Sequence, residues 1–417
     1  MNGNRHCSKI GNHWRWYRPA LAVTTLLAAG ALAAFSRTPA SASTPNAAPA
    51  RATNVMYSFQ CGADGSHPYG GLVQDASSGN LFGTTYYGGA SGKGTVFELT
   101  PAGVESVLYS FTGGADGGYP PTGLLRDSAG NLFGTALGGG TGGQGVVFKV
   151  TAADVESVLY NFTGGADGGY PESSLVEDSA GNLYGTTFNG GASGLGTVFM
   201  LTPAGVETVL HSFTGGTADG ANPATGLARD TTGNLYGTTL NGGAFGDGVV
   251  FKVTTGGVAT ILHSFTGAPG DGSGPAAGVI VDSAGNVFGT TNAGGGLGNG
   301  VVFKITPAGV ESLLLSFDGH LAGRDPSAGL VEDSLGNIYG TTTFGGNVMC
   351  QFSLCGLIFE VSQSGKETVL HNFAGAPSDG ANPYKGSGLI RDTAGNLYGT
   401  TFKGGVSNCG TVYKVLP

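Results

Sequence analysis

Short apolar runs separated by glycine-rich turns recur along the chain from about residue 55 to its end. Each copy contains a Gly-Asn-apolar-aromatic-Gly-Thr string, which begins at Gly79, Gly130, Gly181, Gly233, Gly285, Gly336 and Gly395. These starts lie 51, 51, 52, 52, 51 and 59 residues apart. No run has the 3.6-residue period of an amphipathic helix. A repeat of this length predicts units that bury their apolar faces against their neighbours.

The second copy illustrates the elements that each repeat predicts. Residues 123–127 read as a short strand (A), and a tight turn leads to a second strand (B) over 131–135. After a glycine-rich loop come strand C over 146–150 and strand D over 156–162. Four short antiparallel strands per unit are typical of a β-propeller blade. The sequence therefore predicts an all-β, seven-bladed β-propeller over residues 55–417.

The two ends of the repeat region predict how the ring closes. The region starts with a lone D-type strand over 55–59 and ends with a C-type strand over 411–415 that no D strand follows. We expect the N-terminal strand to complete the last blade, which removes an open sheet edge.

Two residues that recur in every copy have structural explanations. An aspartate at the start of the A–B turn can accept hydrogen bonds from the turn's own backbone, and an acidic ring with a ligand role is the alternative. A glycine within strand B indicates close approach by a neighbouring backbone, as between packed blades. The aspartates are Asp75, Asp127, Asp178, Asp230, Asp282, Asp333 and Asp392. The glycines are Gly83, Gly134, Gly185, Gly237, Gly289, Gly340 and Gly399.

These units resemble a known family. The segments GLLRDSAGNLFGT, GVVFKVT, ESVLYNF and TGGADGGYP look like the GloVer-type tandem repeat of exported bacterial proteins, and the resemblance covers all seven copies. The A–B hairpin is also similar to NHL repeats and to gluconolactonase-like propellers. The GloVer resemblance implies a secreted or surface-attached propeller and brings no established activity or catalytic residues with it.

The N-terminus predicts export. Basic residues within the first 18 positions precede an uncharged run over 19–35, and Ala40-Ser41-Ala42 forms an A-x-A pattern. This order is typical of a signal peptide over residues 1–42, followed by a flexible linker over 43–54. A retained anchor is the alternative, although the run is shorter than the ~20 residues of a spanning helix. The expected location is secreted, periplasmic or on the cell surface.

Charge and composition limit the partners. Five of the 18 Lys and Arg residues lie in the expected signal, which leaves 13 against 27 Asp and Glu, a net charge of −14. A chain this acidic, without a basic cluster, is unsuited to nucleic acid or anionic membranes. The 81 glycines recur at fixed offsets and therefore mark turns rather than disorder. We expect a monomer without a membrane span after signal cleavage.

The longer, variable B–C and D–A loops share one face of a propeller, and we expect a ligand there. The sixth copy has the longest B–C loop, and the D–A loops on either side of this blade are also unusual. The candidate ligand-binding residues in this sector are His320, Arg324, Met349, Phe352, Tyr384 and Lys385. The alternative is that these are tolerated loop insertions.

The cysteines fit an exported chain. Cys7 lies in the expected signal, which leaves an even number. Cys61 follows the first strand and Cys409 precedes the last, so their pairing would lock the ring. Cys350 and Cys355 would clip the long loop. A metal at the latter pair would need further ligands that the nearby sequence lacks.

Other chemical signals are weak. His211, His263 and His371 occupy a strand D position that holds Tyr or Leu in other copies, which indicates packing. Aspartates recur before glycine in the D–A loops, where turn formation explains them and loop calcium is the alternative. These are Asp64, Asp116, Asp167, Asp219, Asp271 and Asp379. No catalytic or phosphate-binding motif is present, so we expect no other cofactor and no metal site.

Three functions remain open. The favoured one is a non-enzymatic exported propeller that binds a glycan, peptide or surface partner through its B–C/D–A face. The alternative is a lactonase- or lyase-like enzyme with a metal or acid/base site at the channel mouth. Among the residues expected to line that mouth, only Glu172 and Lys385 are ionisable, and their blades are not neighbours. A structural envelope protein is the third possibility.

Overall fold

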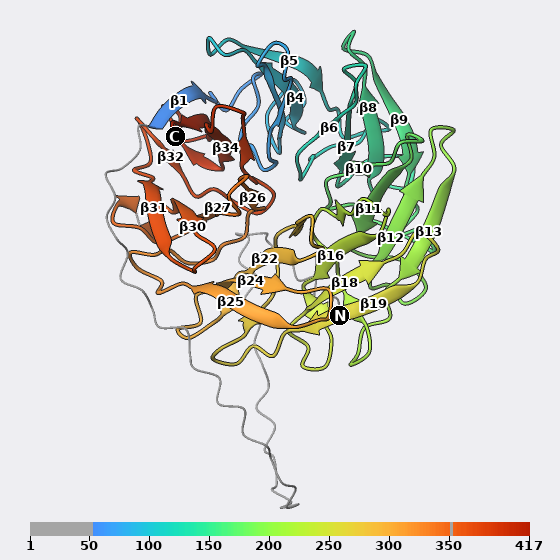
Figure 1. Ribbon diagram of the computed structural model, residues 1–417. Helices are drawn as coiled ribbons and strands as arrows, with labels where there is room; N and C mark the ends of the chain where they lie inside the picture. Colours follow the sequence, from blue (N-terminus) through green and yellow to red (C-terminus); the bar gives the residue numbers. More distant parts are fainter. Residues whose placement is uncertain (1–52, 351–352) are drawn as a thin grey trace, which may run out of the picture. The chain divides into compact units, whose positions relative to one another are not determined.

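The computed structural model describes residues 53–350 and 353–417, and all regular structure in these ranges is β (Figure 1). Seven four-stranded antiparallel sheets follow one another around a ring, one for each copy of the repeat, which confirms the expected propeller. The expected signal peptide and most of the linker lie outside the described residues. The described part of the chain contains no helix with the length and hydropathy of a membrane span.

The innermost strand of each blade is only two residues long. These strands are β2 (Val73–Gln74), β6 (Leu125–Arg126), β10 (Val176–Glu177), β15 (Ala228–Arg229), β21 (Ile280–Val281), β26 (Val331–Glu332) and β33 (Ile390–Arg391). The sequence predicts five residues for this element, so the strand is shorter than expected. The preceding residues converge near the ring axis instead: a Cβ on Gly123 would lie 2.9 Å from the carbonyl oxygen of Gly71 in the previous blade.

The two middle strands of each blade are five residues long and are paired in register. The first set comprises β3 (Leu81–Thr85), β7 (Leu132–Ala136), β11 (Leu183–Thr187), β16 (Leu235–Thr239), β22 (Val287–Thr291), β27 (Ile338–Thr342) and β34 (Leu397–Thr401). The second set comprises β4 (Thr95–Leu99), β8 (Val146–Val150), β12 (Thr197–Leu201), β18 (Val249–Val253), β24 (Val301–Ile305), β30 (Leu357–Val361) and β36 (Thr411–Val415).

The outer strand of each blade is six residues long and contains one irregularity in its pairing. These strands are β1 (Thr53–Ser58), β5 (Glu105–Ser110), β9 (Glu156–Asn161), β13 (Glu207–Ser212), β19 (Ala259–Ser264), β25 (Glu311–Ser316) and β31 (Glu367–Asn372). Four two-residue ladders join loops: β14 (Gly220–Ala221) with β17 (Asn241–Gly242), β20 (Gly272–Ser273) with β23 (Ala293–Gly294), β28 (Met349–Cys350) with β29 (Ser353–Leu354), and β32 (Gly380–Ala381) with β35 (Lys403–Gly404).

The last blade contains both ends of the repeat region. Its strand order is β1-β36-β34-β33, so the N-terminal strand completes the blade as predicted, beginning at Thr53 rather than at Val55. A disulfide joins Cys61 to Cys409, with their Cα atoms 5.4 Å apart. The ring is therefore closed by a strand ladder and by a covalent bond.

Adjacent blades are joined by aromatic packing and by a threonine. The ring of Phe111, at the end of one blade, meets Phe148 of the next edge-on, with centroids 5.0 Å apart, and equivalent pairs recur around the ring. Near the axis, the Thr84 hydroxyl donates to the carbonyl of Thr122 in the following blade at 2.9 Å. Thr400 makes the same bond to Gly70 across the closing seam. The threonine of the repeated string makes this bond at five of the seven blade junctions, whereas the hydroxyl groups of Thr290 and Thr341 have no hydrogen-bond partner among the described residues.

The contact that requires glycine within strand B differs from the one expected. A Cβ on Gly134 would lie 2.6 Å from Cζ of Phe148, its in-register partner on β8 of the same blade. The close approach is therefore made by an aromatic ring within the blade and not by a neighbouring backbone. The turn aspartate behaves as predicted, since Asp127 accepts from the amides of Ala129 and Asn131.

Candidate functional site

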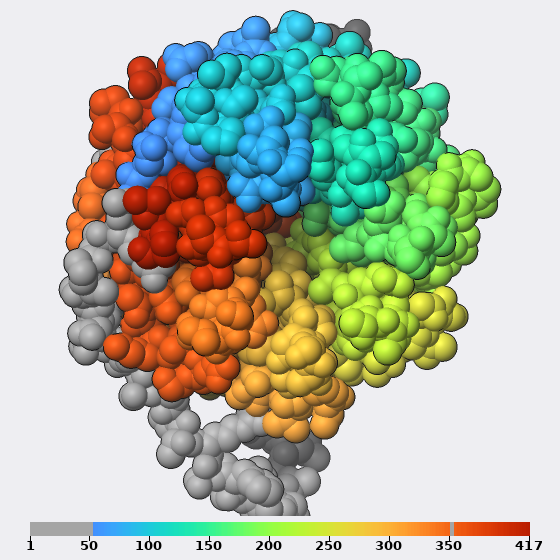
Figure 2. All heavy atoms as spheres, turned by 45° about the horizontal axis from the view of Figure 1, so that its top comes forward, coloured from blue at the N-terminus to red at the C-terminus, as the bar shows by residue number. Residues whose placement is uncertain are grey.

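A cavity of about 300 Å³ lies at the centre of the ring, where Figure 2 shows a hollow between the blades. Most of its wall is made of small and aliphatic residues from the inner segments of the blades, including Thr122, Ala224 and Ala277. Its larger polar side chains are Tyr69, Tyr86, Glu172 and Lys385. The residues expected at the channel mouth therefore do line the cavity.

Glu172 and Lys385 form an ion pair in this cavity. Lys385 Nζ lies 2.9 Å from Glu172 Oε2, and the two side chains are 21% and 25% exposed, respectively. Glu172 precedes blade 3 and Lys385 precedes blade 7, and because these blades are not neighbours the sequence predicts no contact between the two side chains. Because the inner segments converge on the axis, the two long side chains meet across the mouth. The pair gives the cavity one charge of each sign and little net charge.

Aromatic side chains gather beside this ion pair. These side chains, which we call the tyrosine cluster, are Tyr69, Tyr86, Tyr87, Tyr119, Tyr384 and Phe402. Ring centroids lie 5.1 Å apart for Tyr384 and Tyr69, 5.3 Å for Tyr69 and Tyr86, and 5.4 Å for Tyr86 and Tyr119. The rings come from loops at blades 7, 1 and 2. They form a continuous aromatic surface from the cavity outward.

The cluster presents uncharged hydroxyl groups. Burial raises the pKa of Tyr69 above its ordinary value, with smaller contributions from Tyr384 and Glu172. Burial also raises the pKa of Tyr86 to about 12, helped by Tyr87 and Glu172. The nearby imidazole of His67 has a lowered pKa because it is buried and close to Lys403. At neutral pH these groups are hydrogen-bonding partners without charge.

The loop geometry that holds the cluster is repeated in every blade. The residue before the loop proline is left-handed, with φ of 55° at His67 and 61° at Tyr119. Such a conformation is uncommon for a residue with a side chain and costs about 1–3 kcal/mol. Two backbone bonds hold Tyr119: its amide donates to Lys93, and its carbonyl accepts from Leu137. The side chain before proline is thereby fixed on the loop face.

The predicted site residues divide into two groups. Lys385 lines the cavity, and Tyr384 belongs to the tyrosine cluster beside it. Arg324 instead lies over the ring of Phe344, 5.2 Å from its centroid, and His320 is exposed nearby in the loop before blade 6.

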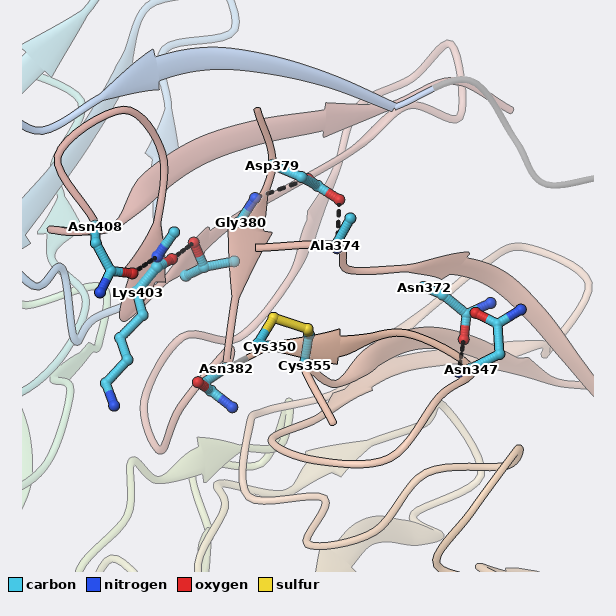
Figure 3. The surroundings of a disulfide bond; sticks show 12 residues. Asn347, Cys350, Cys355, Asn372, Ala374, Asp379, Gly380, Asn382, Lys403 and Asn408 are labelled. Atoms are coloured by element: carbon cyan, nitrogen blue, oxygen red, sulfur yellow. Dashed lines mark hydrogen bonds between the residues drawn. A yellow bond between two sulfur atoms is a disulfide. The ribbon is translucent and has the colours of Figure 1, made fainter. Parts of the chain in front are cut away.

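The other two predicted residues belong to the long loop of blade 6. Met349 is 63% exposed on β28, and Phe352 lies outside the described residues. The predicted Cys350–Cys355 disulfide closes this hairpin (Figure 3). The Cys355 carbonyl accepts a hydrogen bond from the amide of Asn382 at 2.7 Å.

The sequence did not single out most of the tyrosine cluster. Unusual loop length points to blades 5 to 7, whereas the cluster, apart from Tyr384, uses loops of ordinary length. The sequence does contain a signal, because the position directly after the loop proline holds Tyr69 in blade 1 and Tyr384 in blade 7 but no aromatic residue in the other five copies. Comparing side chains at equivalent loop positions would have located it.

The strand D position is also more than a packing position. Tyr57 donates to Asp64 at 3.0 Å, and His211 lies 3.1 Å from Asp219, so each side chain binds the aspartate of the following loop. The same aspartates accept from the loop's own amides, for example Asp116 from Thr112. This is the turn-forming role expected for them.

Solved structures with a similar fold are found among bacterial propellers. An extracellular domain of a putative hybrid two component system from B. thetaiotaomicron matches with a TM-score of 0.53 and 11% identity, over 87% of this chain and 39% of that chain. A gluconolactonase from Xanthomonas campestris matches with a TM-score of 0.43 and 13% identity, over 92% and 99%. A putative gluconolactonase matches with a TM-score of 0.45 and 12% identity, over 89% and 93%. At these identities the likeness concerns the fold alone.

No curated protein matches the chain. The Gloeobacter/Verrucomicrobia repeat matches it twice, over residues 45–231 and 216–413, and the two matches together span nearly the whole propeller. The seven blades, each built on the Gly-Asn-apolar-aromatic-Gly-Thr string, thus place the protein in the Gloeobacter/Verrucomicrobia repeat family.

Proposed function

We propose that the protein is an exported, non-enzymatic propeller that binds a glycan over the tyrosine cluster and the mouth of the central cavity. The observation that carries this proposal is that the tyrosine cluster is continuous with the central cavity. Among the described residues that line the cavity, the only charged side chains are Glu172 and Lys385, which neutralise each other. The ligand would lie on the B–C/D–A face, with its reducing or non-reducing end towards Glu172 and Lys385.

Tyrosine suits a sugar because it offers both an apolar ring face and a hydroxyl group. The C–H faces of a pyranose can pack on the ring, while its hydroxyl groups exchange hydrogen bonds with the phenols. Tyr384 and Tyr87 are 36% and 40% exposed, so their rings are accessible at the outer end of the cluster. A cavity of about 300 Å³ is at the lower end of the size range of ligand pockets, sufficient for one or two sugar units.

The uncharged state of the cluster favours a neutral ligand. A charged group on the ligand would have to displace Glu172 or Lys385 from the ion pair, or would lose its hydration among the phenol rings. Each of these costs free energy. An extended peptide is the alternative occupant of this face, but the edge strands nearest the cavity, β2 and β33, are only two residues long and offer little backbone for a peptide strand to pair with.

The location is supported by the two disulfides, which persist in oxidising compartments. Cell-surface attachment or release into the medium would both fit a glycan-binding role.

Isothermal titration calorimetry with a panel of neutral oligosaccharides tests the proposal. We expect saturable binding that Tyr384→Ala and Tyr87→Ala each weaken about tenfold, the range for loss of one aromatic contact. Phe245→Ala is the matched control, since Phe245 is 63% exposed in a loop of blade 4. Equal affinity in the Tyr384 and Phe245 variants would refute the cluster as the binding surface.

The same panel, with lactones added, distinguishes binding from catalysis. Turnover of a sugar or lactone that Glu172→Gln abolishes would replace the binding role with the enzymatic alternative. Binding of unstructured peptides in place of every sugar would assign the face to a protein partner.

A further inference from the structure

We propose that His263, Asp271 and Glu311 bind one divalent transition-metal ion, of which Zn²⁺ is the probe, between blades 4 and 5. The site is remote from the tyrosine cluster and independent of the proposed glycan binding. His263 lies on β19, Asp271 lies in the following loop, and Glu311 is the first residue of β25. β19 and β25 are the outer strands of adjacent blades (Figure 1).

The ligand atoms are already near coordination geometry. His263 Nε2 lies 3.2 Å from Asp271 Oδ1 and 3.7 Å from Glu311 Oε1, and all three ligand atoms lie within 4.8 Å of one another. Around a tetrahedral ion, bonds of about 2.0–2.2 Å place neighbouring ligand atoms roughly 3.3–3.6 Å apart. Small side-chain movements would therefore seat an ion, with water in the fourth position.

The surroundings favour a bound ion. The side chains of His263, Asp271 and Glu311 are 17%, 9% and 5% exposed, so two carboxyl groups are held together largely away from water. The amides of Gly272 and Thr266 donate to Asp271 at 2.6 and 2.9 Å and orient its carboxylate. One imidazole nitrogen with two carboxylate oxygens suits Zn²⁺, whereas Ca²⁺ requires six to eight oxygen ligands.

The repeat provides its own comparison. At the interface of blades 3 and 4, His211 and Asp219 are present, but Ala259 stands at the position of Glu311. Blades 7, 1 and 2 have tyrosine at the position of His263, namely Tyr57, Tyr109 and Tyr160. Within residues 53–350 and 353–417, the group at blades 4 and 5 is the only one that brings together three potential ligands of the His, Cys, Asp and Glu types.

The experiment measures zinc stoichiometry and affinity on the full chain, purified without an affinity tag and stripped of metal. Calorimetry with Zn²⁺, and the visible absorption of added Co²⁺, are the readouts. We expect one saturable site that Glu311→Ala weakens at least about 100-fold, more than the loss of an outer-shell partner. Since this substitution reproduces the natural residue at Ala259, the fold should be retained, which circular dichroism checks.

The reverse substitution makes the test specific. Ala259→Glu would complete the group at His211 and Asp219 and raise the stoichiometry from one ion to two. Ca²⁺ should produce no heat at this site. Absence of saturable Zn²⁺ binding, or a stoichiometry that neither Glu311→Ala nor Ala259→Glu changes, would overturn the proposal and leave the three side chains as a hydrogen-bonded network.

Discussion

Lys385 Nζ lies 2.9 Å from Glu172 Oε2 although the two residues are 213 positions apart and belong to blades that are not neighbours. An ion pair thus spans the channel mouth and joins opposite sides of the ring. Its side chains are about one-fifth to one-quarter exposed, so solvent screens the attraction only in part.

We predict that Glu172→Gln and Lys385→Met each lower the free energy of unfolding, because each leaves one charge without its partner in a confined cavity. The double variant should recover most of the loss. A coupling free energy of about 1 kcal/mol is expected, between the values for exposed and buried pairs. Urea unfolding of the four proteins gives this number directly. Strictly additive effects would mean that the two charges are solvated separately.

The disulfide at the ring seam should contribute more stability than the one in the blade 6 loop. The residues joined are 348 apart for Cys61–Cys409 and 5 apart for Cys350–Cys355. The chain-entropy model then assigns about 6 and about 2 kcal/mol, respectively, as upper values. We predict a clearly larger drop in melting temperature for a Cys61→Ser/Cys409→Ser variant than for Cys350→Ser/Cys355→Ser. Equal drops would show that the β1–β36 ladder alone holds the ring closed.

Replacing the glycine within strand B should create a steric conflict with the aromatic ring on strand C. Gly134→Ala would bring a Cβ to 2.6 Å from Cζ of Phe148, which is buried and cannot move away easily. We expect a loss of about 1–3 kcal/mol, the usual cost of overpacking. Phe148→Leu leaves room at the ring tip, so adding Gly134→Ala to that variant should cost much less. Thermal unfolding of the two single variants and the double variant measures this difference.

The architecture could be predicted because it repeats. A seven-fold pattern of turns and short apolar strands determines blade number, and the unpaired strands at the two ends determine how the ring closes. The pairing of Cys61 with Cys409 follows from that closure. Strand A was predicted too long because the sequence does not show how closely the inner segments, such as those at Gly71 and Gly123, converge on the axis.

The candidate site was harder to predict because it depends on which blades face each other. Glu172 and Lys385 are distant in chain order, and only the narrow axis of the ring brings them together. The hydrogen bond between the strand D side chain and the loop aspartate can be recognised in the sequence. The only copy with Leu in this position, Leu315, has Ala322 where the others have the aspartate, so the two positions change together.

That exception creates an unusual acid at Glu367. The side chain is 2% exposed, and among the described residues neither carboxyl oxygen has a hydrogen-bond partner. At the corresponding interface of blades 7 and 1, the Tyr57 hydroxyl lies 3.5 Å from Glu105, whereas Leu315 has no group to donate. Burial, with a contribution from Asp318, raises the pKa of Glu367 from 4.5 to about 8.

We therefore predict that the protein loses stability as the pH rises from 4.5 to 8. Over this range the folded state keeps the proton on Glu367 that the unfolded chain releases, so the stabilising contribution is complete below pH 4.5 and is lost by pH 8. The shift corresponds to at most about 5 kcal/mol. Glu367→Gln, which mimics the neutral acid, should have nearly the same free energy of unfolding as the wild type at pH 5 and a higher one at pH 8.

Urea unfolding at both pH values measures the difference, with Glu98→Gln on β4 as the control. Parallel pH profiles for the wild type and Glu367→Gln would show that the carboxyl group is ionised in the folded protein.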